Sequence, residues 1–441
     1  MFTVDSKFCA RSAWTSTFGA NIVVMLCGMA TGIISARALH PEGRGALAAL
    51  ILWPQLLADA GVLGIHEALT QRIGACDREN RQKVLGTALV ICLALSVIGV
   101  IAGFVAVPLL LGQDRANLFR LARWYIAIDV PANLLLLALY AFDHGQMRFW
   151  RYNLSRSVVP VFYGLGVAAL FVTGAASVES ILAANVASTL AGLCMTAYLA
   201  RASLSLQFSR AEAAVLASLA WQFNITALLL LISSQADRIV VVKFWDNASV
   251  GLYVVALTVS TTGARALAHS FHTVIFPGMV RQPDLAAQSQ YLARGLRHTF
   301  FLTCLSTAAL MISCRYLVPL LFGKSFVEAV GLAIILLLAQ IPNTLRQVAV
   351  RALRGIGEGT PGSIAEAFTG ATFLVSAPLL AAPFGLSGLA WAVCFANFAS
   401  LIYIGVYLRK RLGLYTREWL GLDRRTAYEL YGYGRSLFAR T

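Results

Sequence analysis

Apolar segments of helical length recur along almost the whole chain, and each is bounded by charged residues or by Gly and Pro clusters. Because about 20 apolar residues are needed to cross about 30 Å of hydrocarbon, each segment predicts a membrane-spanning helix. The twelve predicted spans are residues 14–36, 45–70, 84–111, 121–142, 157–174, 179–200, 213–236, 250–276, 298–314, 329–350, 362–383 and 388–408. The pattern therefore predicts an all-α polytopic membrane protein that ends in a basic tail.

The composition agrees with this pattern. Hydrophobic residues make up 59% of the 441 residues and charged residues 12%, against about 50% and about 25% in soluble proteins. Twelve spans with short loops use the whole chain, which leaves no room for a soluble catalytic domain or a nucleic-acid-binding module. The formal net charge of +15 is therefore interpreted against a lipid bilayer, and no nucleic acid is expected as a partner.

The distribution of Lys and Arg predicts the orientation, because short cytoplasmic loops hold the excess of these residues. With a cytoplasmic N-terminus, 24 of the 35 Lys and Arg residues lie on the cytoplasmic side, nine lie in outer loops and two lie inside spans. Both termini are therefore expected in the cytoplasm, which agrees with an even number of spans.

The sequence carries no motif for a metal or a cofactor. Its eight cysteines are scattered, without a C-x-x-C pair or histidines at zinc spacing, and are interpreted as small packing residues. Gly323-Lys324-Ser325 matches only the end of a phosphate-binding loop, because Val318 stands where its first glycine would be and no strand precedes it. Neither a metal nor a cofactor is predicted.

The two halves of the chain share a pattern. A shift of 206 residues places Ala36 to Leu39 on Val242 to Trp245 and Gly45 on Gly251. Each copy has a span, a basic residue, a short polar loop, a glycine and then the next span. Internal repeats are typical of transporters, and we expect a parallel six-plus-six repeat. The expected parts are two six-helix lobes, residues 1–205 and 206–408, and a basic cytoplasmic tail, residues 409–441.

Four short motifs follow one another along the chain. They are Ala36 to Leu50 running on to Trp53-Pro54, Ala236 to Trp245 leading to Val250 to Ala256, Leu353 to Gly359, and Phe384 to Trp391. In sequence and order they resemble the Wzx-like polysaccharide flippases of the MOP exporter superfamily, to which MATE multidrug exporters also belong. The resemblance covers nearly the whole chain.

The resemblance implies a transporter whose two lobes rock about a central cavity. Its substrate would be a polyprenyl-pyrophosphate-linked oligosaccharide, moved from the cytoplasmic to the outer leaflet of a bacterial inner membrane. Such transport serves the synthesis of lipopolysaccharide O-antigen, capsule or exopolysaccharide. The implied partners are this lipid-linked oligosaccharide, membrane lipid, and a polysaccharide polymerase with its chain-length machinery.

Basic residues inside spans are the candidates for binding the substrate. Arg265, His269 and His272 fall at i, i+4 and i+7 of the eighth span and so share one helix face. Arg346 lies in the tenth span. An ionisable group inside a span costs about 2.5–3.5 kcal/mol and usually faces a cavity or a partner, and guanidinium groups bind phosphate oxygens bidentately. The alternatives are a snorkelling Arg265 and neutral, packed histidines.

Acidic residues inside spans are the candidates for coupling transport to a proton gradient. They are Asp59 and Glu67 in the second span, expected close to one face, Asp129 in the fourth and Glu366 in the eleventh. A carboxylate whose pKa is raised by desolvation could bind and release a proton during transport. A structural ion pair or a hydrogen-bonded acid is an equally good interpretation.

Other functions fit the sequence less well. A MATE-like multidrug antiporter would need an acidic or aromatic cavity for cationic drugs, which Arg265 and Arg346 oppose. A polysaccharide polymerase or ligase generally needs a large outer loop to hold the acceptor sugar, whereas all the predicted outer loops are short, so no enzyme is predicted. A scaffolding protein would leave the repeat and the intramembrane charges unexplained.

Overall fold

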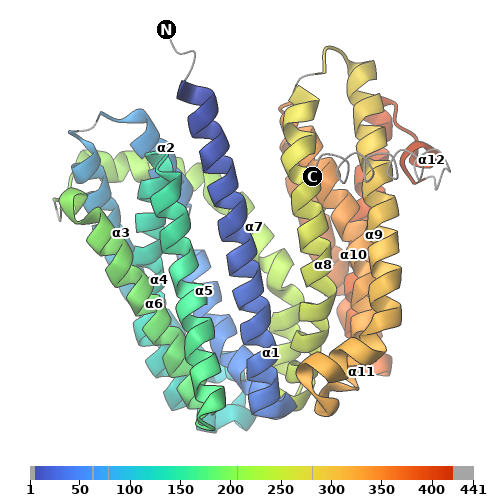
Figure 1. The fold of residues 1–441 in the computed structure, drawn as a ribbon, viewed down its shortest axis with the longest axis horizontal. Helices are drawn as coiled ribbons and strands as arrows, with labels where there is room; N and C mark the ends of the chain where they lie inside the picture. Colours follow the sequence, from blue (N-terminus) through green and yellow to red (C-terminus); the bar gives the residue numbers. More distant parts are fainter. Residues whose placement is uncertain (1–4, 62–63, 78, 206, 281, 421–441) are drawn as a thin grey trace. The chain divides into compact units, whose positions relative to one another are not determined.

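The computed structural model describes residues 5–61, 64–77, 79–205, 207–280 and 282–420, and within them it leaves out the side chains of residues 5–15, 18, 113–114, 222–230, 232, 263–274, 276–277 and 280. In these described residues the chain is helical and contains no strand (Figure 1). The α-helices are α1 (Asp5–Gly61), α2 (Ile65–Ala75), α3 (Arg81–Leu111), α4 (Phe119–Gly145), α5 (Phe149–Val172), α6 (Val178–Ala200), α7 (Arg210–Phe244), α8 (Asn247–Val280), α9 (Leu285–Phe322), α10 (Ala329–Gly355), α11 (Thr360–Leu412) and α12 (Thr416–Trp419). Short 3-10 turns connect some of them: η1 (Gln113–Leu118), η2 (Arg201–Ser203) and η3 (Lys324–Phe326).

Two of the helices are kinked: α11 contains two of the predicted spans, and α1 contains the first and most of the second. In α1 the kink is at His40, with a φ of 54°, directly before Pro41, which cannot donate a helical hydrogen bond. In α11 the kink is at Gly385, with a φ of 57°. Among the described residues eight helices, α1 and α11 included, are long and apolar enough to cross a membrane. With α7 and α8 they account for the twelve predicted spans, so the predicted all-α polytopic fold is confirmed.

The second predicted span is interrupted near its end. α1 ends at Gly61 and α2 begins at Ile65, with Gly64 at a φ of 76° before it. Glycine adopts this left-handed conformation without a steric penalty, which allows the chain to leave the helix here. Asp59 therefore lies on α1 and Glu67 on α2. The prediction that they share a face of one helix is wrong.

The chain forms two compact units. The first is Met1–Leu231 with Arg238–Gly251, and the second is Ile232–Asp237 with Leu252–Thr441. In the first unit α4 is the central helix, because it contacts α1, α2, α3, α5 and α6 and buries Ile126, Leu134 and Phe142. In the second unit α10 packs between α9 and α11 and buries its apolar side chains against them.

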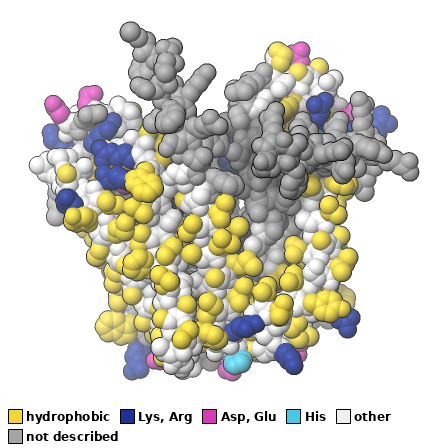
Figure 2. Space-filling model, viewed as in Figure 1, with side chains coloured by type: hydrophobic (Ala, Val, Ile, Leu, Met, Phe, Trp, Pro, Cys, Tyr) yellow, Lys and Arg dark blue, Asp and Glu magenta, His cyan; other side chains and the backbone are white. Residues whose placement is uncertain are grey.

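Apolar side chains also cover the outside of the helices. On α3 the side chains of Val97, Ile98, Ile101, Val105 and Leu109 are exposed, and α9 and α11 present similar rows. On the face of the molecule that Figure 2 shows, hydrophobic side chains lie along the middle of the helices, with Lys and Arg toward the helix ends. A soluble protein rarely exposes apolar patches of this extent. The chain is therefore a multi-pass membrane protein whose outer helix faces contact lipid.

The two repeat-related glycines make reciprocal contacts inside the first unit. A Cβ on Gly45 would lie 1.7 Å from the carbonyl oxygen of Asn247, and one on Gly251 would lie 2.0 Å from the carbonyl oxygen of Pro41. Asn247 is Pro41 shifted by the same 206 residues that relate Gly251 to Gly45. Such exchange of equivalent contacts is what a two-fold relation between two similar segments produces. The helices approach this closely because both positions lack a side chain.

Arg115 stabilises the same contact between the segments of Gly45 and Gly251. This buried side chain of η1 donates through Nε to Asn247 Oδ1 at 2.6 Å and through Nη2 to the carbonyl oxygen of Trp245 at 2.7 Å. It also donates to the carbonyl of Val242 in the last turn of α7. Helix C-termini leave carbonyls without partners and carry partial negative charge. Arg115 supplies hydrogen-bond donors for these carbonyls and a positive charge next to them, and so connects the end of α7 to the turn after α3.

The connection between the sixth and seventh spans is docked on α3. A Cβ on Gly86 would lie 2.2 Å from the carbonyl oxygen of Ser205, so the backbone at Ser205 passes directly over the backbone of α3. The Ser209 N–H donates to Thr87 Oγ1 at 3.0 Å. The connection between the halves is therefore held by the first unit and is not a loose linker.

An ion pair between α2 and the start of α7 completes this docking and predicts an acid dependence. Arg72 donates to both carboxylate oxygens of Glu212, at 2.9 and 2.7 Å, and these hydrogen bonds lower the pKa of Glu212 from 4.5. Because the pKa is lower in the folded than in the unfolded state, the stabilisation is present above about pH 4.5 and is lost as pH falls through the lowered pKa.

Between pH 7 and acidic pH, we therefore expect the free energy of unfolding to fall by about 1 kcal/mol more for the wild type than for Glu212→Gln. The two proteins would be compared by differential scanning fluorimetry from pH 7 to pH 3. Parallel curves for the two proteins would show that the pair contributes no stability.

Candidate functional site

Arg346 and Glu366, a candidate binding residue and a candidate coupling acid, form an ion pair in the second unit. Arg346 lies in the middle of α10 and is 4% exposed, whereas Glu366 lies two turns into α11 and is half-buried. The guanidinium donates through Nη1 to Glu366 Oε1. Placing both in one membrane-embedded pair keeps the site close to neutral and avoids the cost of an isolated charge.

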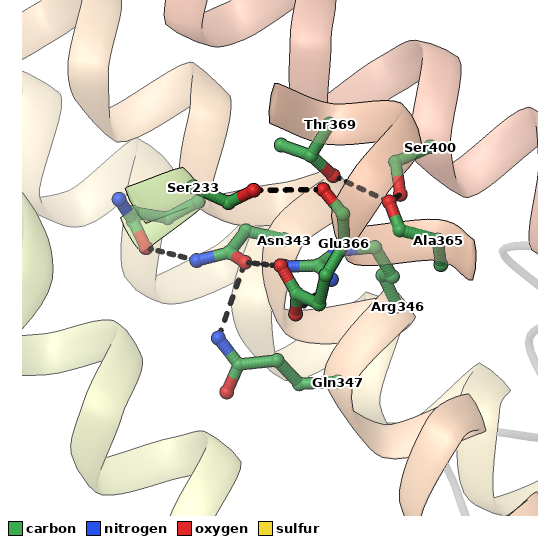
Figure 3. A network of polar contacts seen from close by, with 9 residues as sticks. Ser233, Asn343, Arg346, Gln347, Ala365, Glu366, Thr369 and Ser400 are labelled. Carbon is green, nitrogen blue, oxygen red and sulfur yellow. Dashed lines mark hydrogen bonds and ion pairs between the residues drawn. The ribbon is translucent and has the colours of Figure 1, made fainter. Parts of the chain in front are cut away.

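A network of neutral polar groups surrounds this pair (Figure 3). Arg346 Nη2 donates to Asn343 Oδ1 at 3.1 Å, and Gln347 Nε2 donates to the same oxygen at 3.1 Å. Ser233 of α7 donates to the main-chain carbonyl of Glu366 at 3.0 Å. The network thus joins α7, α10 and α11 through groups that can exchange hydrogen-bond partners.

The guanidinium of Arg346 keeps one donor beyond its contacts with Glu366 and Asn343. Arg346 Nε is buried and has no hydrogen-bond partner, so part of the guanidinium is not used by Glu366 and Asn343. An anionic ligand that approached Arg346 would compete with Glu366 for the guanidinium. Such a ligand would therefore have to replace an internal ion pair.

Asp129 lies in a second network, inside the first unit. It is 3% exposed on α4, and Asn133 Nδ2 donates to its Oδ2 at 2.8 Å. Thr189 of α6 donates to its Oδ1 at 3.4 Å. The carboxyl is thus buried among neutral donors and forms no ion pair with the described basic residues.

The other candidates are placed differently. Asp59 and Glu67 are exposed, on α1 and α2. Arg265, His269 and His272 belong to α8, but their side chains lie outside the described residues. The structure therefore brings together one candidate base and one candidate acid. Among the described residues no group of three His, Cys, Asp or Glu side chains could hold a metal ion.

Sequence reasoning missed Arg156 as a basic residue inside a span. Arg156 was expected in a cytoplasmic loop, because the fifth span was predicted to begin at residue 157, whereas α5 begins at Phe149. Arg156 is therefore two turns inside the helix.

Residues 34–331 match the family described as polysaccharide biosynthesis proteins. The chain belongs to this family. The match covers more than half of the sequence and includes Gly45, Gly251 and the whole of the α7–α8 connection. A comparison with curated protein sequences gave no match.

Solved structures of transporters share the fold. The lipid II flippase MurJ in an inward closed conformation superposes with a TM-score of 0.77 at 15% identity, over 96% of this chain and 92% of that one. An inward-facing multidrug resistance MATE transporter of the MOP superfamily gives 0.73 at 18% identity, over 88% and 94%. A MOP superfamily transporter from Pyrococcus furiosus gives 0.63 at 16%, over 91% and 95%. The family member described here thus has the MOP transporter fold.

Proposed function

We propose that this protein moves a polyprenyl-pyrophosphate-linked oligosaccharide from the cytoplasmic to the outer leaflet during the synthesis of a surface polysaccharide. The observation that carries the proposal is the family match over residues 34–331 in a chain with the MOP transporter fold. A family of polysaccharide biosynthesis proteins supplies the substrate class, and a transporter fold supplies the activity. The protein is on this proposal a transporter and not an enzyme.

The pyrophosphate of the substrate is the group that the intramembrane cations would hold. Arg265, His269, His272 and Arg346 are the proposed binding residues, and guanidinium groups bind phosphate oxygens through charge-assisted hydrogen bonds. The hydrophilic saccharide would then travel beside these residues while the polyprenyl tail stays in the bilayer.

Energy for transport is available from the membrane potential. Moving one elementary charge across 100 mV is worth about 2.3 kcal/mol, and two negative charges that leave an inside-negative cell move downhill. A proton could add to this by binding Asp129 or Glu366, which are buried or half-buried beside neutral donors or a base. Asp59 and Glu67 remain candidates of the same kind at exposed positions.

The proposed setting follows from the same function. Two lobes, residues 1–205 and 206–408, would rock about the site, and the basic tail, residues 409–441, would lie on the cytoplasmic side with the N-terminus. The membrane would be the bacterial inner membrane. A polysaccharide polymerase and its chain-length machinery would receive the transported saccharide.

Leaflet exchange in proteoliposomes tests the proposal. A polyprenyl-pyrophosphate saccharide with a fluorescent sugar would be incorporated, and an impermeant quencher would report the fraction in the outer leaflet. We expect the wild type to exchange the lipid and Arg265→Ala to slow exchange at least tenfold, with an inside-negative potential accelerating export. Arg435→Ala in the tail is the matched control for removal of one basic side chain.

Two results would decide against the proposal. The first is no exchange above protein-free liposomes for any pyrophosphate-linked saccharide. The second is proton-coupled movement of small organic cations by the same preparation, which would assign the multidrug antiporter function instead.

A further inference from the structure

Arg156 is a basic side chain that lies inside a membrane span of the first unit. α5 begins at Phe149 and is one of the helices apolar enough to cross a membrane. Arg156 follows seven residues later, which is about 10 Å along the helix axis. Its side chain is half-buried. A charge at such a position is expensive, and its partners decide whether it has a structural or a binding role.

The partners of Arg156 are neutral. Its Nη2 donates to the side-chain oxygen of Asn21 on α1, and its guanidinium carbon lies 5.4 Å from the centre of the Tyr152 ring. Tyr152 is itself stacked on His144 of α4, with ring centroids 5.0 Å apart. Three helices thus hold the guanidinium in place without supplying a negative charge.

No carboxylate of the described residues forms an ion pair with Arg156. The buried acid at the end of α4, Asp143, is paired with Arg151 at 3.3 Å. Arg346 in the second unit is paired with Glu366. The Nε of Arg156 is moreover buried without a hydrogen-bond partner. Among the described residues no carboxylate therefore compensates the positive charge of Arg156, and its Nε donor is unused.

Asn153, one turn before Arg156, anchors this part of α5. It is 2% exposed and donates to Thr17 Oγ1 at 2.9 Å and Ser16 Oγ at 3.3 Å on α1. Its own Oδ1 is buried without a partner. Residues three apart share a helix face, so the unused acceptor of Asn153 and the unused donor of Arg156 belong to the same side of α5, the side that packs on α1.

We propose that Arg156, held by Asn21 and Tyr152, is a binding site for the phosphate group of a membrane lipid. This inference rests on the proposed function for the identity of that lipid, a polyprenyl-pyrophosphate-linked saccharide that enters from the cytoplasmic leaflet. A phosphate oxygen supplies the negative charge and the acceptor that Arg156 lacks, in the bidentate geometry that a guanidinium favours. The site is distinct from the Arg346 and Glu366 pair, since it lies in the other unit.

A second source has the same chemistry. The phosphate of an anionic phospholipid, such as phosphatidylglycerol, would also satisfy Arg156. A polyprenyl pyrophosphate offers more negative charge and more acceptor oxygens than a phosphodiester. The pyrophosphate lipid is therefore expected to bind more tightly.

Binding of lipid to the full-length protein in a maltoside detergent, which contains no phosphate, tests the site. A fluorescent polyprenyl pyrophosphate and phosphatidylglycerol would be titrated separately into the wild type and Arg156→Gln. We expect Arg156→Gln to weaken binding of the pyrophosphate lipid about tenfold or more. Arg201→Gln is the matched control, because Arg201 is exposed on η2, carries the same charge and contacts Tyr198 in a similar way.

Thermal stability separates a binding role from a structural one. Gln can still donate to Asn21, and the substitution removes a charge that no described carboxylate compensates, so the unfolding temperature of Arg156→Gln is expected to equal or exceed that of the wild type. If the unfolding temperature of Arg156→Gln falls instead, the binding experiment is done with Arg156→Lys, because Lys keeps the charge and loses the bidentate geometry. Reduced affinity of Arg156→Lys at wild-type stability supports the site, and unchanged affinity overturns it.

The outcomes separate the site from the proposed function. If Arg156→Gln loses affinity for both lipids, the result supports a phosphate site. If it loses affinity for phosphatidylglycerol alone, the result also supports a phosphate site and assigns it to phospholipid. Equal affinities of wild type and Arg156→Gln for both lipids overturn the inference. Because binding is measured without transport, absence of leaflet exchange by the wild type would reject the proposed function and leave the Arg156 site standing.

Discussion

Alanine at Gly251 or at Gly45 is expected to prevent accumulation of a stably folded protein. The new Cβ would lie 2.0 Å from the Pro41 carbonyl oxygen in the first case and 1.7 Å from the Asn247 carbonyl oxygen in the second. A backbone carbonyl cannot move aside by changing a rotamer, so the two helices would have to separate. Overpacking typically costs 1–3 kcal/mol, and backbone collisions of this size place the expected loss above about 3 kcal/mol.

The measurement is the unfolding temperature and monodispersity of each variant in detergent. Gly28→Ala is the matched control, because Gly28 lies on α1, as Gly45 does, and nothing lies within 4 Å of its Cβ position. It is expected to leave stability unchanged or raise it slightly, since Ala restricts the unfolded chain. An unfolding temperature of Gly251→Ala within a few degrees of the wild type would contradict the close crossing.

Replacing either member of the Arg346 and Glu366 pair alone is expected to be strongly destabilising. Arg346→Leu would leave a carboxylate without its cation, and Glu366→Leu would leave a buried guanidinium unpaired. Breaking a buried pair in this way costs about 3–5 kcal/mol. Arg346→Leu/Glu366→Leu together should recover most of this loss, because no isolated charge remains.

Transport distinguishes what the pair does beyond stability. If Arg346 holds the pyrophosphate, the double variant should be stable and still fail to exchange the lipid-linked saccharide between leaflets. Recovery of both stability and leaflet exchange would show that Arg346 has only a structural role. Arg315→Leu, at an exposed position of α9, is the control and is expected to change stability by less than about 0.5 kcal/mol.

Much of the candidate chemistry could be found from the sequence, but not its partners. Arg346 and Glu366 were identified as costly intramembrane charges, and the structure joins them into one pair. For Glu366 the sequence offered a coupling acid or a structural ion pair, and the structure contains an ion pair with Arg346. Arg156 was missed because the apolar run begins after it, while the helix begins seven residues earlier.

The sequence alone determined the fold class and where the apolar segments of membrane-spanning length lie. These are local properties, since the length of an apolar run sets whether it crosses a bilayer. Only the tertiary structure decided which polar groups meet. Arg115 is bonded to Asn247, 132 residues away, and Arg156 to Asn21, 135 residues away. Such contacts depend on how each helix is rotated and where it crosses its neighbours, which close packing between helices sets and a hydropathy pattern does not contain.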